Sequence, residues 1–247
     1  IASDNTAHVF IVKGYGSTFT LTYTKYSSDR QTAVVVTKNL FAMSDKNFDV
    51  AVDRSDNLYV VYTSAGNIKW QKLDSDGNLV GSAVTIDTQT SPCMSPKISI
   101  DPHDSKSYIV YQSQLGPSSI RLYFTSRDLS AGNLITSPKA LTTGSNNLIN
   151  QSVYVDADYW MYVAWEDSTE AKVYYRVFDD IGAPLQDVVE VSAATNYVGV
   201  GTLTGSSRQP QIKVADNKAA FITFLQDKGS GVYGLSIYTN GAATMIN

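Results

Sequence analysis

A short hydrophobic phrase with an aromatic residue near each end recurs along the chain. It reads Leu-Tyr-Val-Val-Tyr at 58–62, Tyr-Ile-Val-Tyr at 108–111, Tyr-Val-Ala-Trp at 162–165 and Phe-Ile-Thr-Phe at 221–224, with a degenerate Phe-Ile-Val-Lys at 10–13. Counted from the first aromatic residue of each copy, successive copies are 49, 49, 54 and 59 residues apart. A period near 50 residues in a strand-rich chain is typical of a radial array with one four-stranded sheet per repeat. The pattern therefore predicts an all-β fold, a β-propeller of about five four-stranded blades, either closed or a portion of a larger propeller.

The second repeat shows the plan of one blade most clearly. Phe48–Asp53 alternates apolar and polar residues, as a half-buried inner strand does. Leu58–Thr63 is almost continuously apolar, which predicts a strand covered on both faces. Ile68–Leu73 and Val80–Ile86 follow as the third and outer strands, separated by the turn Asp74–Asn78, whose Asp and Gly residues suit a hairpin.

The same plan divides residues 1–247, taken as one domain, into five successive blades. Their approximate bounds are 1–43, 44–91, 92–146, 147–205 and 206–247. Inner strands are expected at Phe48–Asp53, Lys97–Asp101, Gln151–Asp156 and Gln211–Asp216, each ending in an aspartate, with a stub at 1–4 in the first blade. The last strand is expected at 242–247, and the longest irregular segment is 195–209.

Composition limits the classes of partner. The net charge is −4 and no basic run is present, so a nucleic-acid backbone finds little counter-charge and no nucleic-acid partner is expected. The apolar runs are too short to cross a membrane. A charged fraction of only 17% suits an extracellular or cell-surface protein, and the start at Ile1 suggests a processed or trimmed product. The single cysteine, Cys93, is expected as a lone thiol rather than a link to another chain.

Two stretches carry a resemblance to known proteins. Val-Ala-Val-Asp-Arg-Ser-Asp-Asn-Leu-Tyr-Val-Val-Tyr at 50–62 and Val-Tyr-Val-Asp-Ala-Asp-Tyr-Trp-Met-Tyr-Val-Ala-Trp at 153–165 resemble the repeats of sialidase-like and lectin-like β-propellers. The resemblance implies the architecture over nearly the whole chain. The Asp-box of sialidases does not appear, so no catalytic residue is transferred from that family, and a shared fold does not by itself imply a shared activity.

Glycoside hydrolysis needs two carboxyl groups flanking the scissile bond. The aspartates that recur at the end of each inner strand are expected to cap turns instead. Glu166 is an acid that does not recur with the repeat and follows a strand aromatic, which makes it the best single catalytic candidate. A solvated residue at the end of a strand is the simpler interpretation of the same residue.

Two other features suggest ligands. Asp74, Asp76 and Asn78 alternate oxygen-bearing side chains around Gly77, as a calcium loop does, but the acidic residue that such a loop needs further on is supplied only by the distant Asp87. A plain hairpin turn is the simpler interpretation of these residues. Tyr159 and Trp160 break the repeat at a turn and are candidate binding residues for the C–H faces of sugars. Asn150 begins a glycosylation sequon, Asn150-Gln151-Ser152.

These features favour a secreted or surface-exposed propeller that acts as a binding or structural module, with a glycan or protein ligand and no cofactor. The alternative is a five-bladed-propeller glycoside hydrolase. A further alternative is a structural subunit of an extracellular assembly, formed by self-assembly or by a larger parent chain. The scarcity of acids outside the repeated positions favours binding over catalysis.

Overall fold

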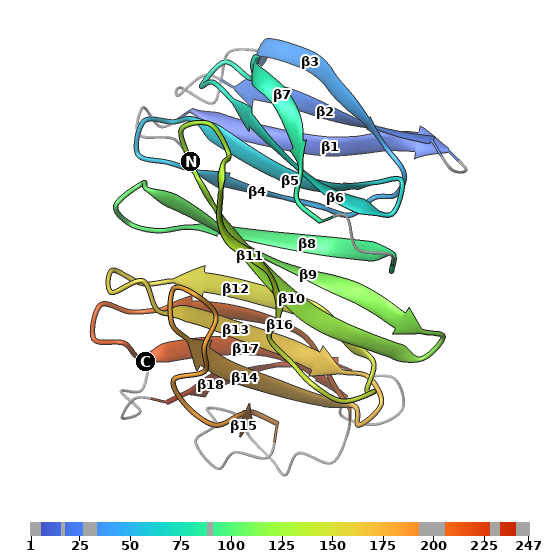
Figure 1. Ribbon diagram of the computed structural model, residues 1–247, viewed down its shortest axis with the longest axis vertical. Coiled ribbons are helices and arrows are strands. Elements are labelled where there is room, and N and C mark those ends of the chain that lie inside the picture. The colour runs from blue at the N-terminus through green and yellow to red at the C-terminus, as the bar shows by residue number, and fades with distance from the viewer. Residues whose placement is uncertain are drawn as a thin grey trace. The chain divides into compact units, whose positions relative to one another are not determined.

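The computed structural model describes residues 6–15, 18–26, 34–87, 91–192, 206–227 and 233–240. Within these ranges the secondary structure is entirely β, with 18 strands in five separate sheets (Figure 1). The strands of each sheet follow one another in the chain, so every sheet is a simple meander. No helix that could span a membrane is found in this described part of the chain. The all-β prediction is confirmed.

The first two sheets have three and four strands. The first contains β1 (Ala7–Tyr15), β2 (Thr18–Tyr26) and β3 (Val34–Met43). The second contains β4 (Phe48–Val52), β5 (Leu58–Ser64), β6 (Asn67–Leu73) and β7 (Leu79–Thr85). As predicted, β5 is buried along nearly its whole length, whereas the outer strand β7 is mostly exposed.

The remaining sheets have four, four and three strands. The third contains β8 (Cys93–Ile100), β9 (Lys106–Gly116), β10 (Ser119–Asp128) and β11 (Leu134–Ala140). The fourth contains β12 (Leu148–Val155), β13 (Met161–Asp167), β14 (Lys172–Phe178) and β15 (Val189–Glu190). The fifth contains β16 (Ser207–Val214), β17 (Ala220–Asp227) and β18 (Tyr233–Thr239). The predicted strand at 242–247, the stub at 1–4 and most of the segment 195–209 lie outside the described residues.

The chain forms two compact units. The first comprises Ile1–Ile100, Asp104–Tyr111 and Thr125–Pro138, and the second comprises Asp101–His103, Gln112–Phe124 and Lys139–Asn247. In the first unit, β2 and β5 supply a core that includes Leu21, Tyr23 and Val60. In the second unit, side chains from β13, β14, β16 and β17 supply a separate core. The assignment of all 247 residues to one domain stays a prediction.

The inner strands of the fourth and fifth sheets begin earlier than predicted because each contains a bulge. Asn150 and Gln209 have φ of 53°, and the pairing register shifts beside each of them. An extra residue in one strand interrupts the alternation of side chains between the two faces of the sheet. The alternating pattern in the sequence is therefore visible only after the bulge, where the prediction placed the start of each strand.

The turn after each inner strand is closed by an aspartate in three of the sheets. Asp53 accepts hydrogen bonds from the backbone N–H groups of Ser55 and Asn57, and Asp156 and Asp101 accept equivalent bonds in their own turns. In the fifth sheet the same position is occupied by Ala215, whose N–H donates to Ala219 O. Asp216 lies one residue further on and is exposed, so the aspartate repeat does not extend to the fifth sheet.

In the second, third and fourth sheets, a glycine in the outer turn packs on an aromatic ring of the preceding sheet. A Cβ atom built on Gly77 would lie 2.3 Å from the ring of Tyr23, and one on Gly132 would lie 2.6 Å from that of Trp70. A Cβ atom on Gly182 would lie 2.8 Å from the ring of Phe124. All three glycines have φ between 71° and 76°, a region that glycine enters without a steric penalty. Glycine is therefore required at this position for two reasons, its backbone conformation and its lack of a side chain.

Candidate functional site

A cleft of about 300 Å³ opens beside the fourth sheet, within the second unit. Its walls come from the segment between β11 and β12, from the end of β13, from β14 and from the residue before β15. The lining residues are Leu141, Thr142, Thr143, Gly144, Asn146, Leu148, Trp165, Asp167, Tyr174, Arg176 and Val188. Apolar surface and a few polar groups are thus combined in one concavity, which is the usual composition of a small-molecule site.

Two aromatic rings form one wall of the cleft. Trp165 on β13 and Tyr174 on β14 lie directly opposite each other in the strand register, and their rings stack with centroids 6.2 Å apart. Trp165 is only 4% exposed, whereas Tyr174 is half-buried. Tyr174 therefore offers its ring to a ligand while Trp165 supports it from the side.

Two carboxylates meet at one end of this wall. The Nδ2 group of Asn146 donates hydrogen bonds to Asp167 Oδ2 at 2.6 Å and to Glu170 Oε1 at 3.2 Å. Because both oxygens lie on the same nitrogen, they are within about 6 Å of each other, close to the separation of about 5–5.5 Å between the two carboxyl groups of retaining glycosidases. The side chain of Asn146 thus fixes the spacing of an acidic pair.

The turn between β13 and β14 holds this pair in place. Asp167 Oδ1 accepts hydrogen bonds from the N–H groups of Thr169 and Glu170, so the carboxylate closes its own turn and brings Glu170 back toward it. The hydroxyl group of Tyr174 donates to Glu170 Oε2. This hydrogen bond is the main reason that the pKa of Glu170 is lowered, and Glu170 is ionised at neutral pH. Burial and the same bond raise the pKa of Tyr174, which keeps its proton.

A cationic group faces the cleft further along β14. The Nε group of Arg176 donates to Gln186 O at 2.7 Å, and its guanidinium lies 5.8 Å from the centre of the Phe178 ring. Backbone and ring together hold the side chain in one orientation. The cleft therefore contains anionic groups at one end, aromatic rings in the middle and a cationic group at the other end.

Glu166, the predicted catalytic candidate, points away from this cleft. Successive residues of a strand face opposite sides of the sheet, so Glu166 lies opposite Trp165 and Asp167. It is 4% exposed, and its Oε2 accepts bonds from Asn150 Nδ2 at 2.8 Å and from Gln209 N at 3.1 Å. These two partners are the bulge residues of β12 and β16. Glu166 thus links two inner strands, and its catalytic role stays a prediction.

The predicted binding residues Tyr159 and Trp160 lie at the opposite end of β13 from the cleft. Tyr159 has φ of 63°, and its ring lies 5.2 Å from the ring of His103. The ammonium group of Lys218 lies 3.5 Å from the centre of the Trp160 ring and also pairs with Asp158. Trp160 remains 37% exposed, so this edge offers an aromatic surface that one lysine partly covers. Its binding role stays a prediction.

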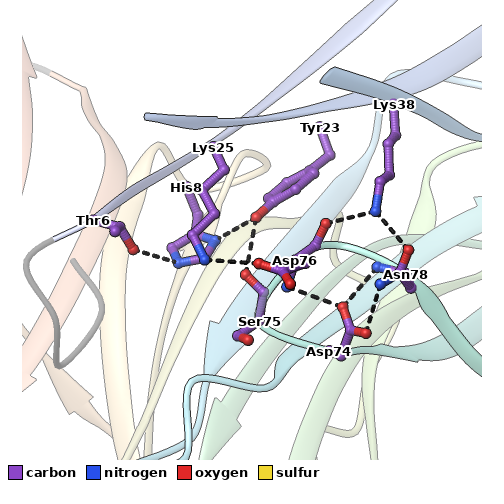
Figure 2. Close-up of polar contacts among 9 residues, drawn as sticks. All are labelled: Thr6, His8, Tyr23, Lys25, Lys38, Asp74, Ser75, Asp76 and Asn78. Atoms are coloured by element: carbon purple, nitrogen blue, oxygen red, sulfur yellow. Dashed lines mark hydrogen bonds and ion pairs between the residues drawn. The ribbon is translucent and has the colours of Figure 1, made fainter. Parts of the chain in front are cut away.

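The outer turn Asp74–Asn78 is bound to two lysines of the first sheet (Figure 2). Lys25 Nζ pairs with Asp76 Oδ1 at 2.9 Å, while Lys38 Nζ donates to Asp76 O at 2.7 Å and to Asn78 Oδ1 at 2.6 Å. Asp74 accepts bonds from the N–H groups of Asp76 and Asn78 and from Asn78 Nδ2. The oxygens proposed as calcium ligands therefore accept hydrogen bonds from lysine ammonium groups and from N–H groups of the turn.

The same close-up shows how the first sheet contributes a second set of contacts to this turn (Figure 2). The hydroxyl group of Tyr23 donates to Ser75 O at 3.4 Å and lies 2.8 Å from His8 Nδ1, whose other ring nitrogen lies 3.2 Å from the hydroxyl group of Thr6. Together with the ring of Tyr23 under Gly77, these contacts fasten the second sheet to the first. Within the described ranges no group of three or more His, Cys, Asp or Glu residues is placed to hold a metal ion.

The sequon residue Asn150 lies within β12 at the bulge. Its Nδ2 atom, the one that a glycan would modify, donates to Glu166, while the neighbouring Gln151 and Ser152 are buried. Modification of Asn150 would require this bond to break. Glycosylation at this position stays a prediction.

Comparison with solved structures finds the same architecture in other proteins. The chain is 12% identical to the endo-arabinase from Bacteroides thetaiotaomicron, with a TM-score of 0.53 over 96% of this chain and 94% of that one. The catalytic domain of the Coprinopsis cinerea GH62 α-L-arabinofuranosidase gives 14% identity and a TM-score of 0.55 over 97% and 88% of the two chains. The NanB sialidase from Streptococcus pneumoniae gives 13% identity and a TM-score of 0.54 over 90% of this chain and 35% of that one.

These similarities show the fold and nothing further, because the sequence identities are low. The chain is a β-propeller of the architecture shared with sialidase-like proteins, with five sheets of three or four strands in the described residues. No protein-family model matches it, and no curated protein sequence is similar to it.

Sequence reasoning missed most residues of the cleft. Asn146, Asp167 and Arg176 carry no motif, and neither does Glu170, which is bonded to Asn146 at the edge of the cleft. One local signal was available, since Trp165 and Asp167 are two residues apart on a predicted strand and must share a face. The approach of Asn146, which lies 21 residues before Asp167, depends on how the strands pair.

Proposed function

We propose that the protein is a carbohydrate-active β-propeller that hydrolyses a glycosidic bond in the cleft beside β12–β15. The acidic pair of Asp167 and Glu170 is the observation that carries this proposal. Two carboxyl groups at this separation, beside a wall of aromatic rings, match what a retaining glycosidase needs to attack a sugar and to protonate the leaving group. The fold similarity to three glycan hydrolases supports the same class.

The surroundings of the two acids suggest their roles. Glu170 is exposed, and its lowered pKa keeps it as a carboxylate, which suits a nucleophile or base. Tyr174 orients it by donating the hydroxyl proton. Asp167, the buried member of the pair, is then the acid that protonates the leaving oxygen.

Glycan binding without hydrolysis is the second candidate, and one observation favours it. Asp167 accepts hydrogen bonds from three N–H groups, on Thr169, Glu170 and Asn146, so both of its oxygens already hold the turn and the Asn146 side chain. A carboxyl group engaged in this way shapes a binding site but is poorly placed to transfer a proton to a leaving group. An extracellular location, which the sparsely charged composition supports, is part of both candidates.

An activity assay tests the proposal. The purified chain is incubated with arabinan, xylan and sialylated oligosaccharides, and the released reducing ends are measured. Asp167→Asn and Glu170→Gln are each expected to lower the rate by about 10²–10⁴-fold, the usual contribution of a positioned acid or base. Asp216→Asn, which alters an exposed carboxylate of the fifth sheet, is the matched control and is expected to keep full activity.

The outcomes separate the two candidates. Binding of a glycan without release of reducing ends would refute hydrolysis and support the binding module. Equal loss of activity in Asp216→Asn would show that the effects are not local to the cleft. If the chain neither binds nor hydrolyses any glycan of the panel, both candidates are refuted.

A further inference from the structure

The position of Arg176 in the cleft has a consequence for the charge of the ligand. In the register of β13 and β14, Lys172 lies opposite Asp167, Tyr174 opposite Trp165 and Arg176 opposite Val163. The backbone of Arg176 therefore lies four residues along the sheet from the level of Asp167. At about 3.3 Å per residue this corresponds to about 13 Å.

The guanidinium is held with its outer edge available. Arg176 uses Nε for its bond to Gln186 O, and no described residue accepts a hydrogen bond from its two terminal nitrogens. Those nitrogens form a planar fork that matches the two oxygens of a carboxylate. Because Arg176 is half-buried, water screens such a pair less than it would on an open surface.

Charge also determines where an anionic group can lie in the cleft. A second anion placed 4 Å from a carboxylate is repelled by about 4 kcal/mol at an effective dielectric constant of 20. This repulsion falls with distance and is largely screened beyond the Debye length, about 8 Å at physiological ionic strength. The acidic end of the cleft excludes an anion, and the Arg176 end attracts one.

We propose that the cleft selects a glycan that carries a carboxylate, such as a uronic acid, with Arg176 as the specificity-determining residue. The acidic sugar lies at the Arg176 end, separated by the aromatic wall from the bond held between Asp167 and Glu170. The charged group is thus on a different sugar unit from the one that is attacked. This inference rests on the proposed function and adds the class of ligand.

Isothermal titration calorimetry with three forms of one oligosaccharide tests this inference. The forms are a neutral xylo-oligosaccharide, the same backbone carrying a glucuronic acid and the same backbone carrying a sulfate ester. The titrations are made in the Glu170→Gln background, so that the ligand is not consumed and Asn146 and Tyr174 keep a hydrogen-bonding partner. The carboxylated form is expected to bind about 10–100-fold more tightly than the neutral form, as a charged hydrogen bond provides.

Variants at position 176 test whether Arg176 causes the preference for the carboxylated form. Arg176→Gln is expected to remove the preference, and a circular-dichroism spectrum and melting temperature like those of the parent show that the variant is folded. Arg176→Lys keeps the charge without the fork and is expected to retain only part of the preference. Arg54→Gln, at an exposed arginine of the first unit, is the matched control and is expected to behave as the parent.

Several results would overturn the inference, and they differ from failure of the proposed function. Equal affinity for neutral and carboxylated forms, or a preference that survives Arg176→Gln, refutes the role of Arg176 but leaves a glycan-binding cleft. Tighter binding of the sulfate ester than of the carboxylate refutes the assignment of ligand class. Binding of none of the three forms refutes the inference and counts against the proposed function as well.

Discussion

The packing of Gly132 against Trp70 leads to a sharp prediction about stability. Gly132 has φ of 71° in the outer turn of the third sheet, and the Gly132→Ala substitution would place a Cβ atom 2.6, 2.9 and 3.1 Å from three atoms of the indole ring. Trp70 is only 2% exposed and packs against Tyr59 with ring centroids 5.7 Å apart. Because the ring is enclosed, it has little room to move away from an added methyl group.

Two costs add in this variant. An L-residue in the left-handed backbone region costs about 1–2 kcal/mol relative to glycine. Forcing an extra methyl group into a packed contact costs about 1–3 kcal/mol more. The expected decrease in the free energy of unfolding is therefore about 2–5 kcal/mol, measured from the urea midpoint with the slope checked for constancy.

Gly81 offers a matched control in the neighbouring sheet. It has the same φ of 71°, but a Cβ atom built on it would meet nothing within 4 Å. Gly81→Ala should therefore lower the free energy of unfolding only by the cost of placing an L-residue in the left-handed backbone region, about 1–2 kcal/mol. Equal destabilisation by the two substitutions would refute the claim that the ring of Trp70 excludes a side chain at position 132.

A double-mutant cycle isolates the contact itself. Trp70→Leu removes the ring, so the added cost of Gly132→Ala should fall toward the value measured for Gly81→Ala. An unchanged cost in the Trp70→Leu background would mean that the penalty is entirely one of backbone conformation.

Three further predictions concern hydrogen bonds in the first unit. Hydrogen bonds from Asn78 and the turn N–H groups, aided by the charge of Lys38, outweigh burial and lower the pKa of Asp74. The ionised Asp74 therefore stabilises the fold above the unfolded pKa, near 3.9, and this contribution is lost as pH falls through the lower folded pKa. The difference in urea midpoint between wild type and Asp74→Asn should accordingly shrink below about pH 4. Tyr59→Phe removes a donor at 2.8 Å from Asp53 and should lower the free energy of unfolding by about 1.5–3 kcal/mol, whereas a value near zero would mean that the bond contributes nothing. Lys38→Met should lower the free energy of unfolding by at most about 1 kcal/mol, because the two hydrogen bonds of its ammonium group are exposed. Calcium should leave the melting temperature of wild type unchanged, and a calcium-dependent rise would show that the turn binds the ion in spite of its lysines.

The sheets could be predicted because their signals are local. The aromatic phrases at 58–62 and 162–165 became the buried strands β5 and β13, and the Asp/Gly turns between strands formed hairpins. Alternation, apolar runs and turn residues each act over fewer than ten residues. The same logic failed at the bulges beside Asn150 and Gln209, where one extra residue interrupts the alternation. It also failed at Asp216, where spacing alone could not show that Ala215 occupies the turn position.

The candidate site was decided by tertiary structure. Glu166 was the acid that the sequence singled out, yet the alternation along β13 turns it toward β16 and turns its neighbour Asp167 into the cleft. Whether an acid becomes part of a site depends on its partners, here Asn146 for Asp167, and Asn146 and Tyr174 for Glu170.

The amino-acid sequence by itself determined that this chain folds into repeated meandering sheets, because strand periodicity and turn chemistry are properties of neighbouring residues. Only the tertiary structure brought Asn146, Asp167 and Arg176 to one cleft, with Glu170 bonded to Asn146 beside it. The physical reason is that hydrogen-bond register between strands sets which side chains share a face and at what separation. That register is fixed by the packing of whole sheets, and no short segment encodes it.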